Sequence, residues 1–300
     1  MFTGCGTALV TAFRQDGALD EPVLRSLIQR QIDAGINFLV PCGTTGESPT
    51  LSHQEHLRVV QIAIEVAKGK VPVLAGAGGY NTSEVIALAR ELASLGADGI
   101  LSVTPYYNKP TQEGLYQHFK AIAAGISLPI ILYSVQGRTG VNIEPSTVQR
   151  LSLIDNIVGI KEASGNISQM STILNSVDER FLVLSGDDAL ALPLMALGGH
   201  GLISVASNEI PAEMTSLIQL ALENNFPAAR ALHRRYLSLM EINFVESNPI
   251  PVKTALAEMG LLKPVWRLPL LAAKPENQAR IRAILESLKL VERAHAAFTN

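Results

Sequence analysis

Eight short apolar segments constrain the fold of this chain more than any other feature. Each is rich in Val, Ile and Leu and is not more than six residues long. Such segments are typical of strands that are buried on both faces, as in a parallel sheet. They lie at residues 6–11, 38–42, 71–76, 99–104, 129–134, 157–161, 181–185 and 201–205.

Amphipathic helical patterns separate these segments, for example at residues 21–34, 52–67 and 82–95. Ser52 followed three residues later by Glu55 is a typical helix start. Eight alternating strand–helix units predict an α/β fold, a (β/α)8 or TIM barrel. A doubly wound open sheet would show the same alternation, but the glycine fingerprint of dinucleotide-binding folds is missing after the first strand.

The last strand–helix unit ends near residue 225. No further strand is predicted, and helical patterns occupy residues 226–241, 251–259 and 276–290. We therefore expect a catalytic barrel over residues 1–225 and a helical extension over residues 226–300 that packs on it.

Composition excludes several classes of function. The chain has 27 acidic and 24 basic residues, a balance that predicts neither nucleic acid nor a membrane as partner. Its two cysteines, Cys5 and Cys42, fit neither a disulfide framework nor a zinc site, and we expect both to be buried. With no leader-like or membrane-spanning segment, a cytoplasmic protein is expected.

Lys161 is the sharpest candidate for chemistry. Functional groups of a (β/α)8 barrel lie at the carboxyl ends of the strands, and Lys161 is the lysine that ends an apolar segment. Partial desolvation there favours the neutral amine, which can attack a carbonyl and form a Schiff base. A structural ion pair or a phosphate site are the alternatives. Glu162, its neighbour on the strand, should point to the opposite face.

Three further strand ends carry polar candidates. Tyr133 ends the preceding strand, so it should lie about 5 Å from Lys161 and could pass protons, or it could simply pack there. Thr44 and Thr45 lie between glycines and could hold a carboxylate or form a plain turn. Arg138 could bind a carboxylate with its guanidinium or be solvated.

No metal site is predicted. His53 and His56 lie three residues apart on a helix but lack a third ligand in a recognisable pattern. Asp187 and Asp188 could bind a metal, but beside a glycine at a strand end they could equally cap the following helix.

These candidates lie in longer motifs that together resemble the dihydrodipicolinate synthase family of pyruvate-dependent class I aldolases. The motifs follow in order over nearly the whole chain, at residues 43–47, 104–110, 133, 138–140, 159–165 and 248–253. The Arg-Thr-Gly and Tyr-Tyr-Asn-Lys-Pro stretches are more specific for the synthases than for their relatives that cleave sialic acid or keto-deoxy sugar acids.

The resemblance implies a reaction without a metal or other cofactor. Lys161 forms an imine with pyruvate, the enamine attacks L-aspartate 4-semialdehyde, and cyclisation expels the lysine into a product for lysine and diaminopimelate synthesis. Tyr133 relays protons with Thr44 and Thr45, and the Thr45 region also holds the pyruvate carboxylate. Tyr107 joins the relay from a neighbouring subunit of a homotetramer, a dimer of dimers.

The resemblance also implies how the second substrate is held. Arg138 receives the carboxylate of the semialdehyde, and Gly186 and Ile203 line the site through their backbone. The chain departs from the family just before Arg138, where Ser134 and Gln136 replace the usual Asn and Pro. Losing the proline removes a backbone constraint, so we expect a looser loop.

Lysine feedback in bacterial relatives uses a cleft at the subunit interface. The residues that match this cleft are Ser48, His53, His56, Tyr80, Glu84 and Tyr106. Tyr80 stands where lysine-sensitive enzymes often have an amide, so we expect weakened or altered inhibition.

Three other functions compete with the synthase. A sister aldolase would act on a sugar acid, which Arg138 disfavours. A catalytically silent barrel would bind a 2-oxo acid, but the set Lys161, Tyr133 and Thr45 is intact. A phosphate-binding barrel would need a glycine-rich site after the last strands, whereas Gly198 and Gly199 precede the eighth.

Overall fold

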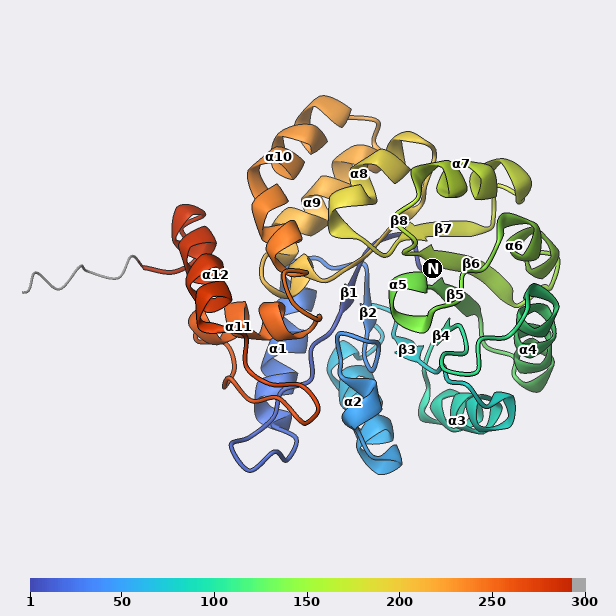
Figure 1. Ribbon diagram of the computed structural model, residues 1–300, viewed down its shortest axis with the longest axis horizontal. Helices are drawn as coiled ribbons and strands as arrows, with labels where there is room; N and C mark the ends of the chain where they lie inside the picture. The colour runs from blue at the N-terminus through green and yellow to red at the C-terminus, as the bar shows by residue number, and fades with distance from the viewer. Residues whose placement is uncertain (293–300) are drawn as a thin grey trace, which may run out of the picture.

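A ring of eight parallel strands forms the centre of the computed structural model, which describes residues 1–292 (Figure 1). The strands pair in the order β2-β1-β8-β7-β6-β5-β4-β3, and a bridge between Leu39 and Val73 joins β2 to β3 and closes the ring. The predicted (β/α)8 barrel is confirmed, and the open sheet is wrong. The strands are β1 Gly4–Ala8, β2 Phe38–Val40, β3 Leu74–Gly76, β4 Gly99–Val103, β5 Ile130–Ser134, β6 Ile157–Glu162, β7 Leu182–Ser185 and β8 Gly201–Ser204.

Helices surround the strands in Figure 1. They are α1 Glu21–Asp33, α2 His53–Ala67, α3 Thr82–Leu95, α4 Gln112–Gly125, α5 Gln136–Thr139, α6 Pro145–Leu151, α7 Ile167–Ser176, α8 Asp188–Ala196 and α9 Pro211–Leu222, with short 3-10 turns η1 Ser48–Thr50 and η2 Ala206–Asn208. The predicted start of α2 is confirmed, because Ser52 and Glu55 bond each other's backbone N–H groups.

Three helices follow the barrel: α10 Phe226–Ile242, α11 Ile250–Glu258 and α12 Pro275–Ser287. α10 packs against α8 and α9, while α12 packs against α10 and α11, at one side of the molecule in Figure 1. The expected extension over residues 226–300 reaches beyond the described chain, since residues 293–300 lie outside it.

Two apolar layers hold the barrel together. Inside the ring, Phe38, Leu74, Ile131, Leu184 and Ile203 belong to one buried cluster. A larger cluster fills the space between the strands and the surrounding helices. Burial on both faces explains why the strands read as unbroken apolar segments.

Some element bounds differ from the expectation. β1 ends at Ala8: the Leu9 N–H still bonds the Val40 carbonyl of β2, but the Val10 N–H bonds the side chain of Asn208, and Val10 packs against residues of α11. Apolarity reports burial, not hydrogen bonding in a sheet. Cys5 and Cys42 are free and buried, as expected. Among residues 1–292, no helix has the length and apolar composition that crossing a membrane takes.

Candidate active site

Lys161 is the second-last residue of β6, and it is 5% exposed. In the sheet it stands opposite Tyr133 of β5, and its Nζ lies 4.3 Å from the centre of the Tyr133 ring. None of the ion pairs in the described chain involves Lys161. A buried amine beside a phenol and without a carboxylate partner is suited to act as a nucleophile.

Glu162 is engaged elsewhere. One of its carboxylate oxygens accepts a hydrogen bond of 2.8 Å from Nε2 of Gln169, and both accept weaker bonds from the Ser164 N–H. Burial raises the pKa of Glu162, partly offset by these hydrogen bonds. The alternative of a structural Lys161–Glu162 ion pair therefore has no support in the geometry.

A pocket of about 320 Å³ opens beside Tyr133, and neither Lys161 nor Thr45 is among the residues that line it. Thr44, Tyr133 and Arg138 all line it, so three of the sequence candidates share one cavity. Apolar side chains of Leu101 and Val103 form part of its wall. This combination of an apolar wall and a few polar groups suits a small polar ligand.

Thr45 is buried at 3% exposure and contacts a residue far along the chain. Its Oγ1 accepts a hydrogen bond of 2.8 Å from Nδ2 of Asn248. The backbone carbonyl of Asn248 in turn accepts a bond of 2.9 Å from Nη2 of Arg138. Sequence reasoning had noted residues 248–253 only as a motif and assigned Asn248 no contact.

The Thr44–Thr45 turn is anchored by an ion pair that sequence reasoning missed. Glu47 has a left-handed backbone, with φ at 53°, and its carboxylate pairs with the ammonium of Lys253 from α11. Both side chains are 0% exposed. Burial lowers the pKa of Lys253, and the nearby Glu47 carboxylate opposes that shift. In the sequence, the sign of this pair was a lysine within the mostly apolar segment of residues 250–258.

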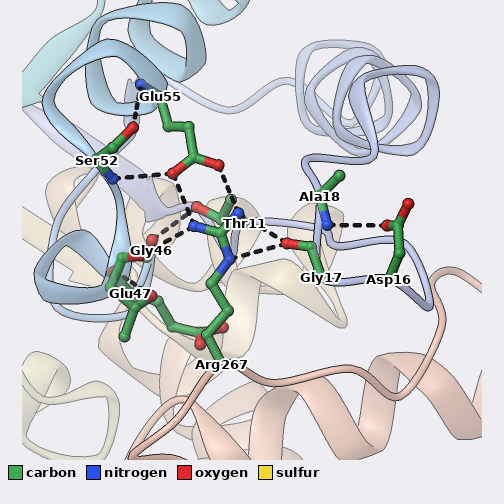
Figure 2. A network of polar contacts seen from close by, with 10 residues as sticks. Thr11, Asp16, Gly17, Ala18, Gly46, Glu47, Ser52, Glu55 and Arg267 are labelled. Carbon is green, nitrogen blue, oxygen red and sulfur yellow. Dashed lines mark hydrogen bonds and ion pairs between the residues drawn. The ribbon is translucent and has the colours of Figure 1, made fainter.

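A second network braces the same turn from outside (Figure 2). Thr11 Oγ1 donates a bond of 2.7 Å to the carbonyl of Gly46. Arg267 donates to the carbonyl of Gly17 and forms an ion pair with Glu55 at 2.5 Å. The hydrogen bond from Arg267 holds the pKa of Glu55 down at about 2.

The other predicted site residues are spread around this centre. Gly186 lies directly against Lys161, since a Cβ placed on it would be 3.0 Å from the lysine Cε. Ile203 lies in the inner apolar cluster with Tyr133. Tyr107 does not line the pocket: it is 92% exposed, and its backbone is left-handed, with φ at 67°.

The segment around Arg138 contains a short helical turn. Residues 136–139 form one helical turn, α5, closed by a bond of 2.9 Å from the Gly140 N–H to the Gln136 carbonyl. Ser134 Oγ accepts from the Ile143 N–H at 3.1 Å. Hydrogen bonds thus hold this segment in the absence of the proline, and the looser loop stays a prediction.

The six residues of the expected inhibitor cleft divide between two pockets. Ser48 and His56 line the pocket already described, while His53, Tyr80 and Glu84 line a second one of about 400 Å³. Tyr106 lines both, and its ring meets the ring of Tyr80 edge to face at 5.2 Å. Burial lowers the pKa of His56.

Asp187 and Asp188 serve as structural groups. Asp187 caps α8 by accepting from the Ala189 N–H at 2.9 Å. Asp188 is buried and accepts from the N–H groups of Val205 and Ala206. Burial raises the pKa of Asp188 to about 6. Within residues 1–292 no three His, Cys, Asp or Glu side chains are grouped so as to hold a metal ion.

Comparison with known proteins places this geometry in a family. A model of the dihydrodipicolinate synthetase family matches residues 1–288. The 4-hydroxy-tetrahydrodipicolinate synthase of Koribacter versatilis is 52% identical over 98% of this chain and 98% of its own. The structure of the Acinetobacter baumannii dihydrodipicolinate synthase, chloride-inhibited and complexed with pyruvate, superposes with a TM-score of 0.96 at 43% identity, covering 97% of this chain and 100% of its own. The Cyanidioschyzon merolae enzyme with lysine bound gives 0.93 at 40% identity, with coverage of 97% and 99%.

Proposed function

The chain belongs to the dihydrodipicolinate synthetase family, and we propose that Lys161 is the amine through which it acts. Its reaction is that of the 4-hydroxy-tetrahydrodipicolinate synthases. Pyruvate condenses with L-aspartate 4-semialdehyde through an imine to a lysine, without a metal or other cofactor. The enzyme is thus a lyase of lysine and diaminopimelate biosynthesis.

One observation carries the assignment of Lys161: it is buried beside Tyr133, and its amine forms no ion pair with a carboxylate within residues 1–292. The amine attacks C2 of pyruvate, and loss of water gives the imine. Removal of a C3 proton gives the enamine, which attacks the aldehyde carbon of the second substrate. The substrate amine then closes the ring on C2 and expels Lys161.

Proton transfer in these steps falls to hydroxyl groups. Tyr133 stands beside Lys161 on the neighbouring strand, with its ring centre 4.3 Å from the lysine Nζ, and Thr44 lines the same pocket as Tyr133. We assign the relay to Tyr133, Thr44 and Thr45. Tyr107 joins it from a second subunit, which agrees with its exposure on its own subunit. This assignment requires an oligomer, and we propose a homotetramer.

The second substrate carries a carboxylate, an amine and an aldehyde. Arg138 reaches the pocket with a guanidinium whose remaining N–H groups can bind that carboxylate. Gly186 and Ile203 complete the site at the ends of β7 and within β8. We also propose that residues 1–225 form the catalytic barrel, that residues 226–300 form its supporting extension, and that the enzyme works in the cytoplasm.

Reduction of the imine tests the assignment directly. Borohydride added with pyruvate should leave one stable adduct on Lys161, located by peptide mass mapping. Lys161→Ala should abolish the adduct and lower kcat by on the order of a thousandfold. Lys263→Ala, at an exposed position outside the pocket, is the matched control and should keep both. An adduct on another lysine would contradict the assignment.

The pocket lined by His53, Tyr80, Glu84 and Tyr106 is the site we propose for L-lysine as inhibitor. Glu84 supplies a charge complementary to an amine, but the Tyr80 ring packs on Tyr106 where an amide would offer hydrogen bonds. We expect weak inhibition in a lysine titration, and tighter inhibition after Tyr80→Asn. Strong inhibition of the unmodified enzyme, unchanged in the variant, would contradict this.

A further inference from the structure

Asn248 contacts two of the residues that we assign to the active site, Thr45 and Arg138. It lies between α10 and α11 and is 6% exposed. Its side-chain amide donates to Thr45 Oγ1 at 2.8 Å, and its backbone carbonyl accepts from Arg138 at 2.9 Å. One residue of the extension therefore contacts a group assigned to proton transfer and the group assigned to the second substrate.

The chemistry of the amide gives the Thr45 contact a direction. Nδ2 of Asn248 faces Thr45, so the amide donates, the Thr45 oxygen accepts, and its single hydroxyl proton is left to donate elsewhere. The amide Oδ1 is buried without a hydrogen-bond partner in the described chain. Within the described chain the Thr45 hydroxyl has no other hydrogen-bond partner. Its proton is therefore available to the relay and not spent on a structural acceptor.

The surroundings of Asn248 hold it in place. The helix that follows, α11, buries Val252 and Leu256 completely in a cluster with Val10. One turn further along, Lys253 pairs with Glu47, two residues beyond Thr45. The turn that carries Thr45 is thus fixed at two points, by Asn248 just before α11 and by Lys253 within α11, as a positioning contact requires.

We propose that Asn248 is a positioning residue that fixes the direction of the Thr45 hydroxyl and thereby the direction of proton transfer in the pyruvate half of the reaction. This inference rests on the proposed function of Thr45. Asn248 itself does not touch the substrate, and its carbonyl holds Arg138 independently of its side chain.

The test is Asn248→Asp, a substitution of nearly equal shape. An ionised carboxylate can only accept, so the Thr45 proton turns toward it and leaves the relay. The backbone bond to Arg138 is kept. We expect kcat to fall roughly 10- to 100-fold, with KM for the semialdehyde within about twofold. Asn225→Asp, which adds the same charge and keeps the cap of α10, is the matched control and should behave as the unmodified enzyme.

Acid should rescue the variant. A protonated carboxyl donates a hydrogen bond as the amide does, so the deficit of Asn248→Asp should shrink as the pH is lowered from about 8 to about 5. A merely structural defect would not respond in this way. A deficit that stays constant over this range would overturn the proposal.

A double-mutant cycle separates this inference from the proposed function. In a Thr45→Val background, Asn248→Asp should change kcat by less than about twofold, because the hydroxyl it redirects is absent. An undiminished effect there overturns the inference.

Two other outcomes concern the proposed function. If Thr45→Val alone is fully active, the role of Thr45 fails. If the unmodified enzyme does not turn over pyruvate and the semialdehyde, the proposed function fails. Asn248→Ser, too short to reach Thr45, repeats the cycle if the Asp variant does not fold.

Discussion

At the scale of single residues, the setting of Lys161 depends on a neighbour without a side chain. This neighbour is Gly186, which directly follows β7, the strand that pairs with the lysine's strand β6. A Cβ at this position would lie 2.6 Å from the Cβ of Ala163 and 3.0 Å from the Cε of Lys161. Both distances are too short for carbon atoms in contact, so the glycine leaves the space in which the lysine stem lies.

Gly186→Ala should therefore displace the Lys161 amine without unfolding the barrel. We expect slower trapping of the pyruvate imine by borohydride and a kcat lowered roughly tenfold or more, because small displacements of a nucleophile are costly. Gly137→Ala is the matched control, since a Cβ there meets nothing within 4 Å. Equal trapping rates in both variants would show that the contact does not matter.

At the scale of elements, the loop after β2 and helix α11 form one unit. Glu47 and Lys253 are 206 residues apart in the sequence and meet as a fully buried ion pair. The lysine amine also lies 4.5 Å from the centre of the Phe13 ring. A buried pair of this kind gives little net stability over apolar residues, but removing one partner leaves an uncompensated charge.

Lys253→Met should accordingly destabilise the protein by about 3–5 kcal/mol, measured as the free energy of unfolding in denaturant. Lys253→Met combined with Glu47→Gln removes both charges and should recover part of that loss. Catalysis should weaken in the single variant as well, because the Thr44–Thr45 turn loses an anchor. A double variant no more stable than the single one would argue against the charge imbalance as the cause.

At the scale of the whole molecule, the ring of strands is complete within one chain, whereas the catalytic set that we propose is not. Direct pairing of β5 with β6 places Lys161 and Tyr133 side by side within one chain. Tyr107, in contrast, is 92% exposed on the loop after β4. A tyrosine in this place serves a reaction only if a second chain brings its site to it, which is the reason for proposing an oligomer.

Mixing two defective variants tests whether Tyr107 serves the active site of a second chain. Tyr107→Phe and Lys161→Ala each damage one component, and a mixed oligomer contains sites with an intact lysine from one chain and an intact tyrosine from the other. After joint unfolding and refolding, activity should exceed the sum of the two separate preparations several-fold, in proportion to the mixed species. Activity equal to that sum would mean that Tyr107 acts within its own chain or not at all.

Much of the molecule could be read from the sequence. The apolar segments predicted the strands of the barrel because burial on both faces demands them, and the helix patterns predicted the starts of α1, α2 and α3. The place of Lys161 at a strand end put it at the catalytic end of the barrel beside Tyr133, since adjacent strands are about 5 Å apart.

What the tertiary structure alone decided is how distant segments meet. No local pattern showed that Asn248 would bond Thr45, that Lys253 would neutralise Glu47, or that Arg267 would pair with Glu55. Periodicity reports only whether a residue is buried and on which face of its own element. The partner across a contact depends on how whole elements pack, and that is settled only when the ring closes and the last helices fold back upon it.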